Sequence, residues 1–307
     1  MKAWPWLLLV CAVPVQSGCS DALPRSQTGD LSRRLAPPPA CILRLPARSS
    51  KAAATRSIRE DGWWRVVFPS FDPTKWELPA NSLTCQGTDV FADAAFRGGT
   101  VRDGGWPLKV REGDIVFGAG VNKMRLLWLR THKHPDGTVS GPLVQARVLE
   151  SHVEVYSVGA FRGPPDRSKL KLERMGPEIL PSVQTDGCLG HKEKSPCTTE
   201  LQLFLPVRGR LTPAARIALE RVAYARASEP GTVGMIEYRL VSTPTFEPGQ
   251  IRIIEQVAAL DEQGRDLRKA ELERVFRATS RGFEASEGSL WERIVLAPKR
   301  ESKADVN

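Results

Sequence analysis

The sequence lacks an uninterrupted apolar run of the length that a membrane-spanning helix needs, about 20 residues. Its first apolar run, residues 3–15, follows a single positive charge at Lys2 and meets no further charge until Asp21. A short apolar run behind one positive charge is typical of a secretory signal peptide. We therefore predict a signal peptide over residues 1–18 and an exported protein.

Signatures of common catalytic and cofactor-binding loops are also missing. The nucleophile motif Gly-x-Ser-x-Gly does not occur. The glycine pairs Gly98-Gly99 and Gly104-Gly105 do not follow a strand and open a helix, as a phosphate-binding loop does. The sequence therefore predicts no cofactor and favours a protein that is not an enzyme.

Positive charge is in excess but nowhere concentrated. Lys and Arg number 44 against 35 Asp and Glu, a formal net charge of +9, and no run of them forms a basic arm. This spread is typical of an ordinary solvated surface. A basic surface attracts anionic groups, so the expected partners are an envelope protein or an anionic polysaccharide. Nucleic acid is not an expected partner.

The residues after the apolar run bear on membrane attachment. Ser17, Gly18 and Cys19 resemble a bacterial lipobox, in which small residues precede a cysteine that is acylated and becomes the mature N-terminus. Gln16 departs from this pattern, because a Leu-like residue is usual there, and ordinary signal-peptide cleavage stays open. Two or more acyl chains anchor a protein stably where one does not. We predict lipidation of Cys19 and attachment to the membrane, most naturally the outer membrane, with the protein facing the periplasm or the cell surface.

The number of cysteines supports acylation independently. Cys11 leaves with the signal peptide, so acylation of Cys19 would leave four cysteines, whereas its absence would leave five and one without a partner. An odd cysteine is a liability where disulfides persist. Four cysteines allow three pairings. We favour Cys188–Cys197, which closes one short polar loop, and this choice leaves Cys41–Cys85.

The chain divides into four parts by composition. After the signal peptide, residues 19–60 are rich in Pro, Ser, Arg and Ala, include Pro37-Pro38-Pro39, and predict a flexible linker. Its one apolar island, residues 41–45, can dock as an edge strand. Residues 61–298 predict a β-rich domain, and residues 299–307 a disordered tail.

Within the domain, short apolar runs alternate with turn residues. The turn Pro135-Asp136-Gly137 between residues 123–131 and 143–149 predicts a hairpin, which residues 153–158 continue. Thr212-Pro213 offers a helix start, so residues 214–227 can be helical. Residues 266–276 also suit a helix, but the turn Gln263-Gly264 favours a strand. Further strands are expected over residues 64–68, 114–117, 169–173, 201–207, 234–242, 250–260 and 269–278.

This pattern predicts a mainly β fold. We expect an antiparallel meander that forms a sandwich, a barrel or a small propeller-like domain, with one or two short helices.

Tryptophan and histidine supply the candidate site residues. Trp63, Trp76 and Trp106 lie in turn-rich stretches and can dock a partner or a sugar ring if exposed, or fold back onto the domain as anchors. Trp128 is expected in the core. His132 and His134 would share one face of a strand and are weak candidate metal ligands beside Asp136, because the sequence specifies no third ligand and two histidines beside a turn are more often surface residues.

The segment Leu126–His132, with Asp136-Gly137-Thr138 and Gly141-Pro142-Leu143 after it, resembles uncharacterised predicted lipoproteins of myxobacteria. The resemblance covers roughly residues 64–293, and the Arg-, Ala- and Pro-rich composition fits such a source. It implies a compartment and nothing about chemistry.

Together these features predict a cell-envelope lipoprotein that acts as a non-enzymatic binding or assembly component of surface machinery, for motility or polysaccharide export. The alternative is a secreted hydrolase or carbohydrate-active enzyme. A deep cleft with converging carboxylates, or a third ligand beside His132 and His134, would favour the enzyme. An apolar patch with exposed tryptophan would favour the binding protein.

Overall fold

A computed structural model describes residues 39–44, 58–79, 81–100, 109–117, 124–190, 194–226, 234–279 and 282–295. The predicted signal peptide, Cys19, most of the predicted linker, Trp106 and the tail 299–307 lie outside these ranges. Within them, neither helix is long and apolar enough to cross a membrane.

Two short helices and two 3₁₀ turns accompany the strands. They are α2 (Glu60–Val67), α3 (Leu290–Ile294), η2 (Ala94–Phe96) and η3 (Glu112–Asp114). The strands are β1 (Cys41–Arg44), β2 (Ile115–Phe117), β3 (Met124–Trp128), β4 (His132–Lys133), β5 (Val139–Val148), β6 (His152–Gly163), β7 (Ser168–Met175), β8 (Glu178–Asp186), β9 (Cys197–Val207), β10 (Arg210–Arg226), β11 (Met235–Glu247), β12 (Gln250–Leu260), β13 (Asp266–Ala278) and β14 (Phe283–Ala285).

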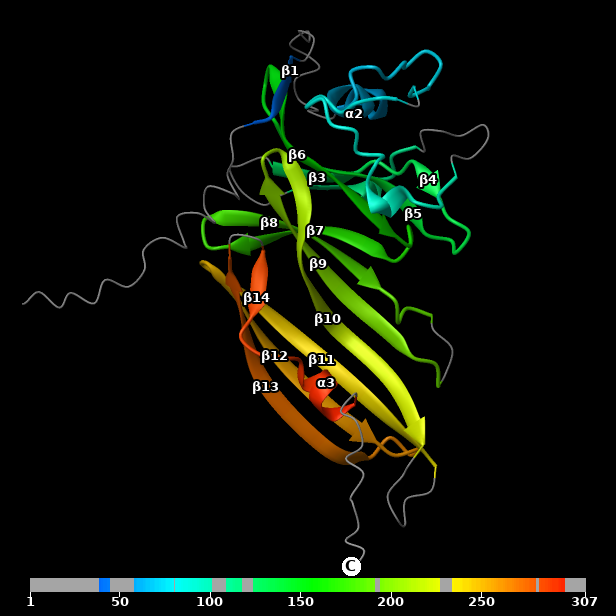
Figure 1. Cartoon of the computed structure of the whole chain (residues 1–307), viewed down its shortest axis with the longest axis vertical. Coiled ribbons are helices and arrows are strands. Elements are labelled where there is room, and N and C mark those ends of the chain that lie inside the picture. Colours follow the sequence, from blue (N-terminus) through cyan, green and yellow to red (C-terminus); the bar gives the residue numbers. More distant parts are fainter. Residues whose placement is uncertain are drawn as a thin grey trace, which may run out of the picture.

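The mainly β fold is confirmed, as one mixed sheet of 14 strands that does not close into a barrel. The main path runs β14-β13-β12-β11-β10-β6-β5-β3-β2, while β7, β8 and β9 branch from β10. In Figure 1, β1, α2 and β2–β6 occupy one end of the molecule, β7–β9 the middle, and β10–β13 with α3 the other end. The expected hairpin is present, because β3 and β4 both pair antiparallel with β5.

A single parallel bridge joins the two ends of the sheet. Arg210 on β10 pairs with Val158 on β6, and the Val158 N–H donates to the Gly209 carbonyl at 2.9 Å. A Cβ at the next residue, Gly159, would lie 2.0 Å from the Leu211 carbonyl oxygen. Only glycine allows this close approach of two backbones. At this point the sheet therefore departs from a purely antiparallel meander, because β10 pairs parallel to β6.

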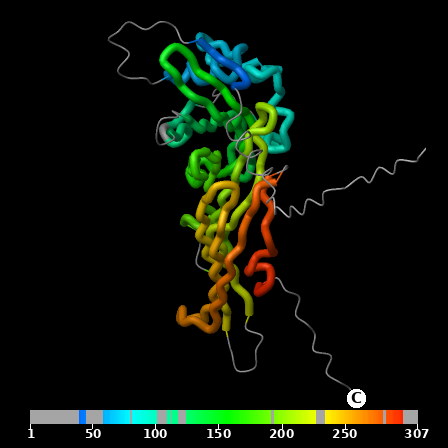
Figure 2. The backbone as a smooth tube through the Cα atoms, turned by 90° about the vertical axis from the view of Figure 1, so that its left-hand side faces the viewer, coloured from blue at the N-terminus to red at the C-terminus, as the bar shows by residue number. Residues whose placement is uncertain are grey.

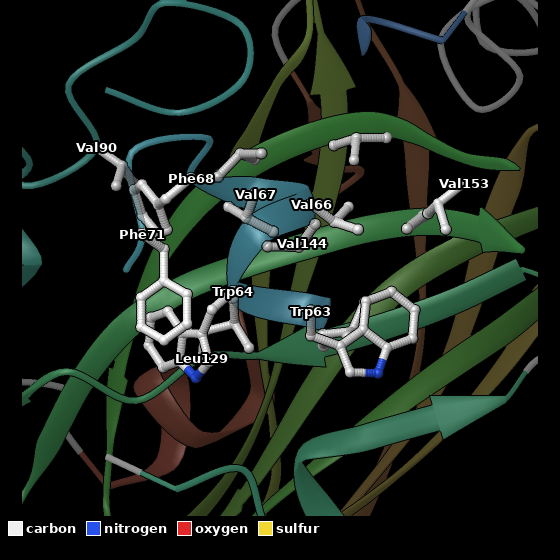
Figure 3. Close-up of a cluster of buried hydrophobic side chains, with 14 of the residues drawn as sticks. Trp63, Trp64, Val66, Val67, Phe68, Phe71, Val90, Leu129, Val144 and Val153 are labelled. Carbon is white, nitrogen blue, oxygen red and sulfur yellow. The ribbon is translucent and has the colours of Figure 1, made fainter. Parts of the chain in front are cut away.

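Of residues 64–68, expected as a strand, the first four belong instead to the helix α2, and Phe68 is its C-cap. Glu60 and Asp61 occupy its first turn, where carboxylates favour a helix N-terminus, and Arg65 lies in its last turn. Trp63, Val66 and Val67 have the spacing of one helix face and are at most 2% exposed. Short apolar runs are ambiguous between helix and strand, and here packing onto β5 and β6 selects the helix. Figure 3 shows this cluster, including Val144 and Val153.

The helix considered for residues 214–227 is absent, and β10 runs through this segment. The Arg208-Gly209 turn leads directly from β9, and β9 and β10 then pair from Arg210 to Val222. The register shifts next to Pro213, where a bulge accommodates a residue that cannot donate to the ladder. Long-range pairing thus overrides the local helix-start signal. The strand expected over residues 266–276 is confirmed as β13, and β8 is a strand that the sequence analysis did not identify.

Both favoured cysteine pairs are disulfide-bonded. Cys41–Cys85 has a Cα–Cα distance of 6.2 Å and Cys188–Cys197 one of 5.0 Å. The first closes a loop of sequence separation 44 and joins β1 to the loops around α2, and β1 adds to the edge of β6. By the chain-entropy model, loops of these lengths are stabilised by about 4 and about 3 kcal/mol. The disulfides indicate an oxidising compartment outside the cytoplasm.

A buried ion pair holds α3 against the sheet. Glu255 on β12 forms a short contact with Arg274 on β13, and accepts hydrogen bonds from the Leu290 N–H at 2.7 Å and from the Ser289 hydroxyl at 3.0 Å. Its side chain is 4% exposed. Trp291 of α3 packs with Leu240 in the same cluster. Figure 2 shows α3 (red) on one side of the β10–β13 ribbon (yellow to orange).

We predict that Glu255→Gln destabilises the protein by about 3–5 kcal/mol, because breaking a buried pair leaves the Arg274 charge uncompensated. The matched control is Glu273→Gln, whose side chain is 55% exposed in an ion pair with Arg252. An exposed pair contributes at most about 1 kcal/mol. Urea unfolding of both variants measures the difference. Equal midpoints would show that the pair does not hold α3.

Candidate functional site

A basic cavity of about 370 Å³ lies beside β4, between the segment that leads into β2 and the β6–β7 loop. Its charged and imidazole side chains are Lys109, Arg111, Arg130, Lys133, His134 and Asp166. Five of these six are basic residue types. The cavity therefore has the electrostatic character of an anion-binding site.

Arg130 forms the buried wall of the cavity and is 3% exposed. Its Nε and Nη2 donate to Asp114 Oδ2 at 3.0 and 2.6 Å, and Nη2 also reaches the Lys109 carbonyl at 3.5 Å. Asp114 accepts the Arg111 N–H at 2.7 Å as well. Burial raises the pKa of the Asp114 carboxyl, against the opposing effects of the Arg111 N–H and the Arg130 charge. The pair fixes the guanidinium and holds η3 against the segment between β3 and β4 that carries Arg130.

His134 lies 6% exposed at the end of β4. Its Nε2 is 3.0 Å from Ser140 Oγ, while its buried Nδ1 has no hydrogen-bond partner in the part of the chain that the structure describes. Desolvation, followed by the charge of Arg162, lowers its pKa, so the ring is neutral at pH 7. A Cβ at Gly99 would come within 2.7 Å of His134 Cε1. The ring is thus wedged between β5 and the Gly99 backbone.

The two candidate metal ligands have different surroundings. His132 is half-buried against aromatic rings, with Phe96 at 5.1 Å and Phe91 at 5.7 Å between centroids. Burial, followed by the neighbouring His134, lowers its pKa. Asp136 is engaged elsewhere, because Thr138 and Arg162 hydrogen-bond its carboxylate and lower its pKa to about 2. Across the described ranges, no group of three His, Cys, Asp or Glu side chains is arranged to hold a metal ion.

The tryptophans that the structure describes do not form an exposed docking patch. Trp63, expected in a turn-rich stretch, lies on α2 and is 2% exposed, which fits the alternative of an anchor folded back onto the domain. The reason is that α2 turns its face onto the sheet. Trp76 is half-buried and meets Phe71 edge-on at 5.4 Å, which fits the alternative of an anchor folded back onto the domain. Trp128 is 1% exposed in the core, as predicted. Trp106 lies outside the described residues.

A second polar cluster, at the β5–β6 end, was not identified from the sequence. Ser151 Oγ lies 3.0 Å from His152 Nδ1, and His152 Nε2 lies 3.4 Å from Glu154 Oε1. The other carboxylate oxygen accepts from Tyr156 at 2.6 Å and Arg147 at 2.8 Å. His152 and Glu154 are two apart on β6 and so share a face, which is the sequence signal that could have revealed them.

This Ser151–His152–Glu154 cluster has the connections of a proton relay, but the order differs from that of a serine hydrolase, in which the acid contacts Nδ1 and the serine Nε2. Burial alone would raise the pKa of Glu154, yet the hydrogen bonds from Tyr156, Arg147 and His152 outweigh it and lower the pKa. Burial and the Glu154 contact raise the pKa of Tyr156 to about 12. The cluster is better explained as a neutralised carboxylate network than as an activated nucleophile.

Comparisons of the chain with protein-family models, with curated proteins and with solved structures find no match.

We predict that Gly99→Ala displaces the His134 ring and destabilises the protein by about 1–3 kcal/mol, the usual cost of overpacking. Gly113→Ala is the matched control, because a Cβ there would meet nothing within 4 Å. Thermal unfolding reports the stability of each variant, and the imidazole NMR signals report the position of His134. If Gly99→Ala and Gly113→Ala gave the same unfolding temperature and the same imidazole signals, His134 would not be packed tightly against Gly99.

Proposed function

We propose that this protein is a cell-envelope lipoprotein, anchored through Cys19, that acts as a non-enzymatic binding or assembly component of surface machinery, for motility or polysaccharide export. We further propose that it is held at the outer membrane and faces the periplasm or the cell surface. The observation that carries the binding role is the basic cavity, where five basic residues meet the single carboxylate of Asp166.

The disulfides support the envelope part of the proposal. Cys41–Cys85 attaches the chain to the domain 22 residues after Cys19 (41 − 19). At about 3.3–3.6 Å per residue, a fully extended linker of this length reaches about 75 Å. An acylated Cys19 would thus keep Cys41, where the domain begins, within that distance of the membrane.

The alternative, a secreted hydrolase, draws on the Ser151–His152–Glu154 cluster. Its acid is already neutralised by Arg147 at 2.6 Å, which argues against a role as the base of a nucleophilic reaction. The binding role is the better supported of the two, because the cavity needs no further group to attract an anion.

Metabolic labelling with a fatty-acid analogue tests the anchor. We expect the parent protein and Cys11→Ala to be labelled, and Cys19→Ala to lose the label, because only Cys19 would become the acylated N-terminus. Cys11→Ala is the matched control, since it removes a cysteine from the same apolar leader. Labelling of Cys19→Ala at the parent level would contradict the lipoprotein assignment.

Affinity capture from solubilised envelopes tests the binding role. We expect a specific envelope complex to co-purify with the parent protein. Recovery of the protein alone, together with turnover of glycan or ester substrates that Ser151→Ala abolishes, would instead establish the hydrolase. The two outcomes are distinct because a binding component needs its partner and an enzyme needs only its substrate.

A further inference from the structure

We infer that the basic cavity is a binding site for a phosphate monoester group, of the kind carried by a phosphorylated sugar or by the headgroup of phosphatidic acid. The inference deepens the proposed binding function and rests on it. It starts from Arg130 and His134, the two polar side chains at the cavity wall that are more than nine-tenths buried.

Both of these side chains have unused hydrogen-bonding capacity. Arg130 donates through Nε and Nη2, and its Nη1 makes no hydrogen bond to any residue that the structure describes. Nδ1 of His134 is buried without a partner in the same set of residues. Buried polar groups are normally hydrogen-bonded, so the buried Nδ1 of His134 calls for a partner that a ligand in the cavity would supply, and Nη1 of Arg130 is a further donor for that ligand.

The balance of charge selects the class of ligand. Arg130 is neutralised by Asp114 at 2.6 Å, and Arg111 by Asp166 at 3.1 Å. Lys109 and Lys133 have no carboxylate partner among the described residues, so the described charged residues of the cavity, counted together with Asp114, sum to +2. A phosphate monoester carries about −1.5 to −2 at pH 7, whereas a carboxylate carries only −1.

The geometry of the donors favours the same ligand. A carboxylate is best recognised by the two-pronged fork of an arginine, but the Nε–Nη2 fork of Arg130 is already occupied by Asp114. What remains is a single guanidinium nitrogen and two lysines on separate segments, Lys109 before η3 and Lys133 on β4. Lysine acts as a point charge toward phosphate, and donors from several directions suit a tetrahedral group.

Calorimetric titration of the purified full-length protein tests the inference. The ligands are inorganic phosphate, glucose 6-phosphate and glucuronate at constant ionic strength. The Lys109→Gln/Lys133→Gln variant should bind phosphate at least about tenfold more weakly, because two charges close to a dianion are removed. The matched control, Lys75→Gln/Lys269→Gln, removes two lysines that do not line the cavity and should bind as the parent does.

The outcomes separate the sources of the phosphate. Tighter binding of glucose 6-phosphate than of inorganic phosphate assigns the group to a glycan. Sedimentation with phosphatidic acid vesicles, but not with phosphatidylcholine vesicles, assigns it to a lipid headgroup.

Three results would overturn the inference: no phosphate binding by the folded parent, equal weakening in both lysine variants, or tighter binding of glucuronate than of glucose 6-phosphate. The titration needs neither the anchor nor a partner. If a complex co-purifies but the protein does not bind phosphate, only the phosphate-binding inference is wrong. If Cys19 is not acylated or no complex co-purifies, the proposed function is wrong, and the titration still tests phosphate binding.

Discussion

The close crossing of β6 and β10 is the contact on which the rest of the structure depends. The backbone of Leu211 passes so near Gly159 that a Cβ added to Gly159 would lie 2.0 Å from the carbonyl oxygen of Leu211. Around this crossing, Trp128, Phe161 and Phe204 pack edge-to-face, with centroids 5.0 and 6.4 Å apart. One aromatic core is thereby shared by strands from both ends of the sheet. Because interiors are close-packed, the position of each end is set by this core.

Two buried carboxylate–arginine pairs then attach the segments that are not part of the sheet. Asp114 binds Arg130 and accepts the Arg111 N–H, and Glu255 binds Arg274 and accepts the Leu290 N–H. In each case one carboxylate compensates a buried charge and satisfies a backbone donor. Buried pairs of this kind are weak evidence for net stability, but losing one partner is costly. Their common effect is to fix where loops and short helices meet strands, and one of them shapes the basic cavity.

Local sequence patterns were sufficient to predict those elements whose conformation is set by their own residues and the turns beside them. The alternation of residues 250–260, ended by Pro248-Gly249 and Gln263-Gly264, predicted β12 with its observed bounds. The Pro135-Asp136-Gly137 turn predicted the hairpin of β3–β5. Local patterns failed where packing decided between alternatives: α2 is a helix because its apolar face covers β5 and β6, and β10 is a strand because β9 precedes it. Trp63 is buried because it lies on the apolar face of α2, a helix that the local pattern did not predict.

The sequence by itself determined most of the strand-forming segments, the tight turns and the even number of cysteines after Cys19, and hence an exported, mainly β protein. All of these depend on neighbouring residues or simple counting. Only the tertiary structure decided the order of the strands, the Ser151–His152–Glu154 cluster and the basic cavity. Lys109, Arg130 and Asp166 come from separate segments, and no local pattern relates them. Their meeting depends on the β6–β10 crossing and the Asp114–Arg130 pair, and such long-range contacts are set by packing of the whole chain.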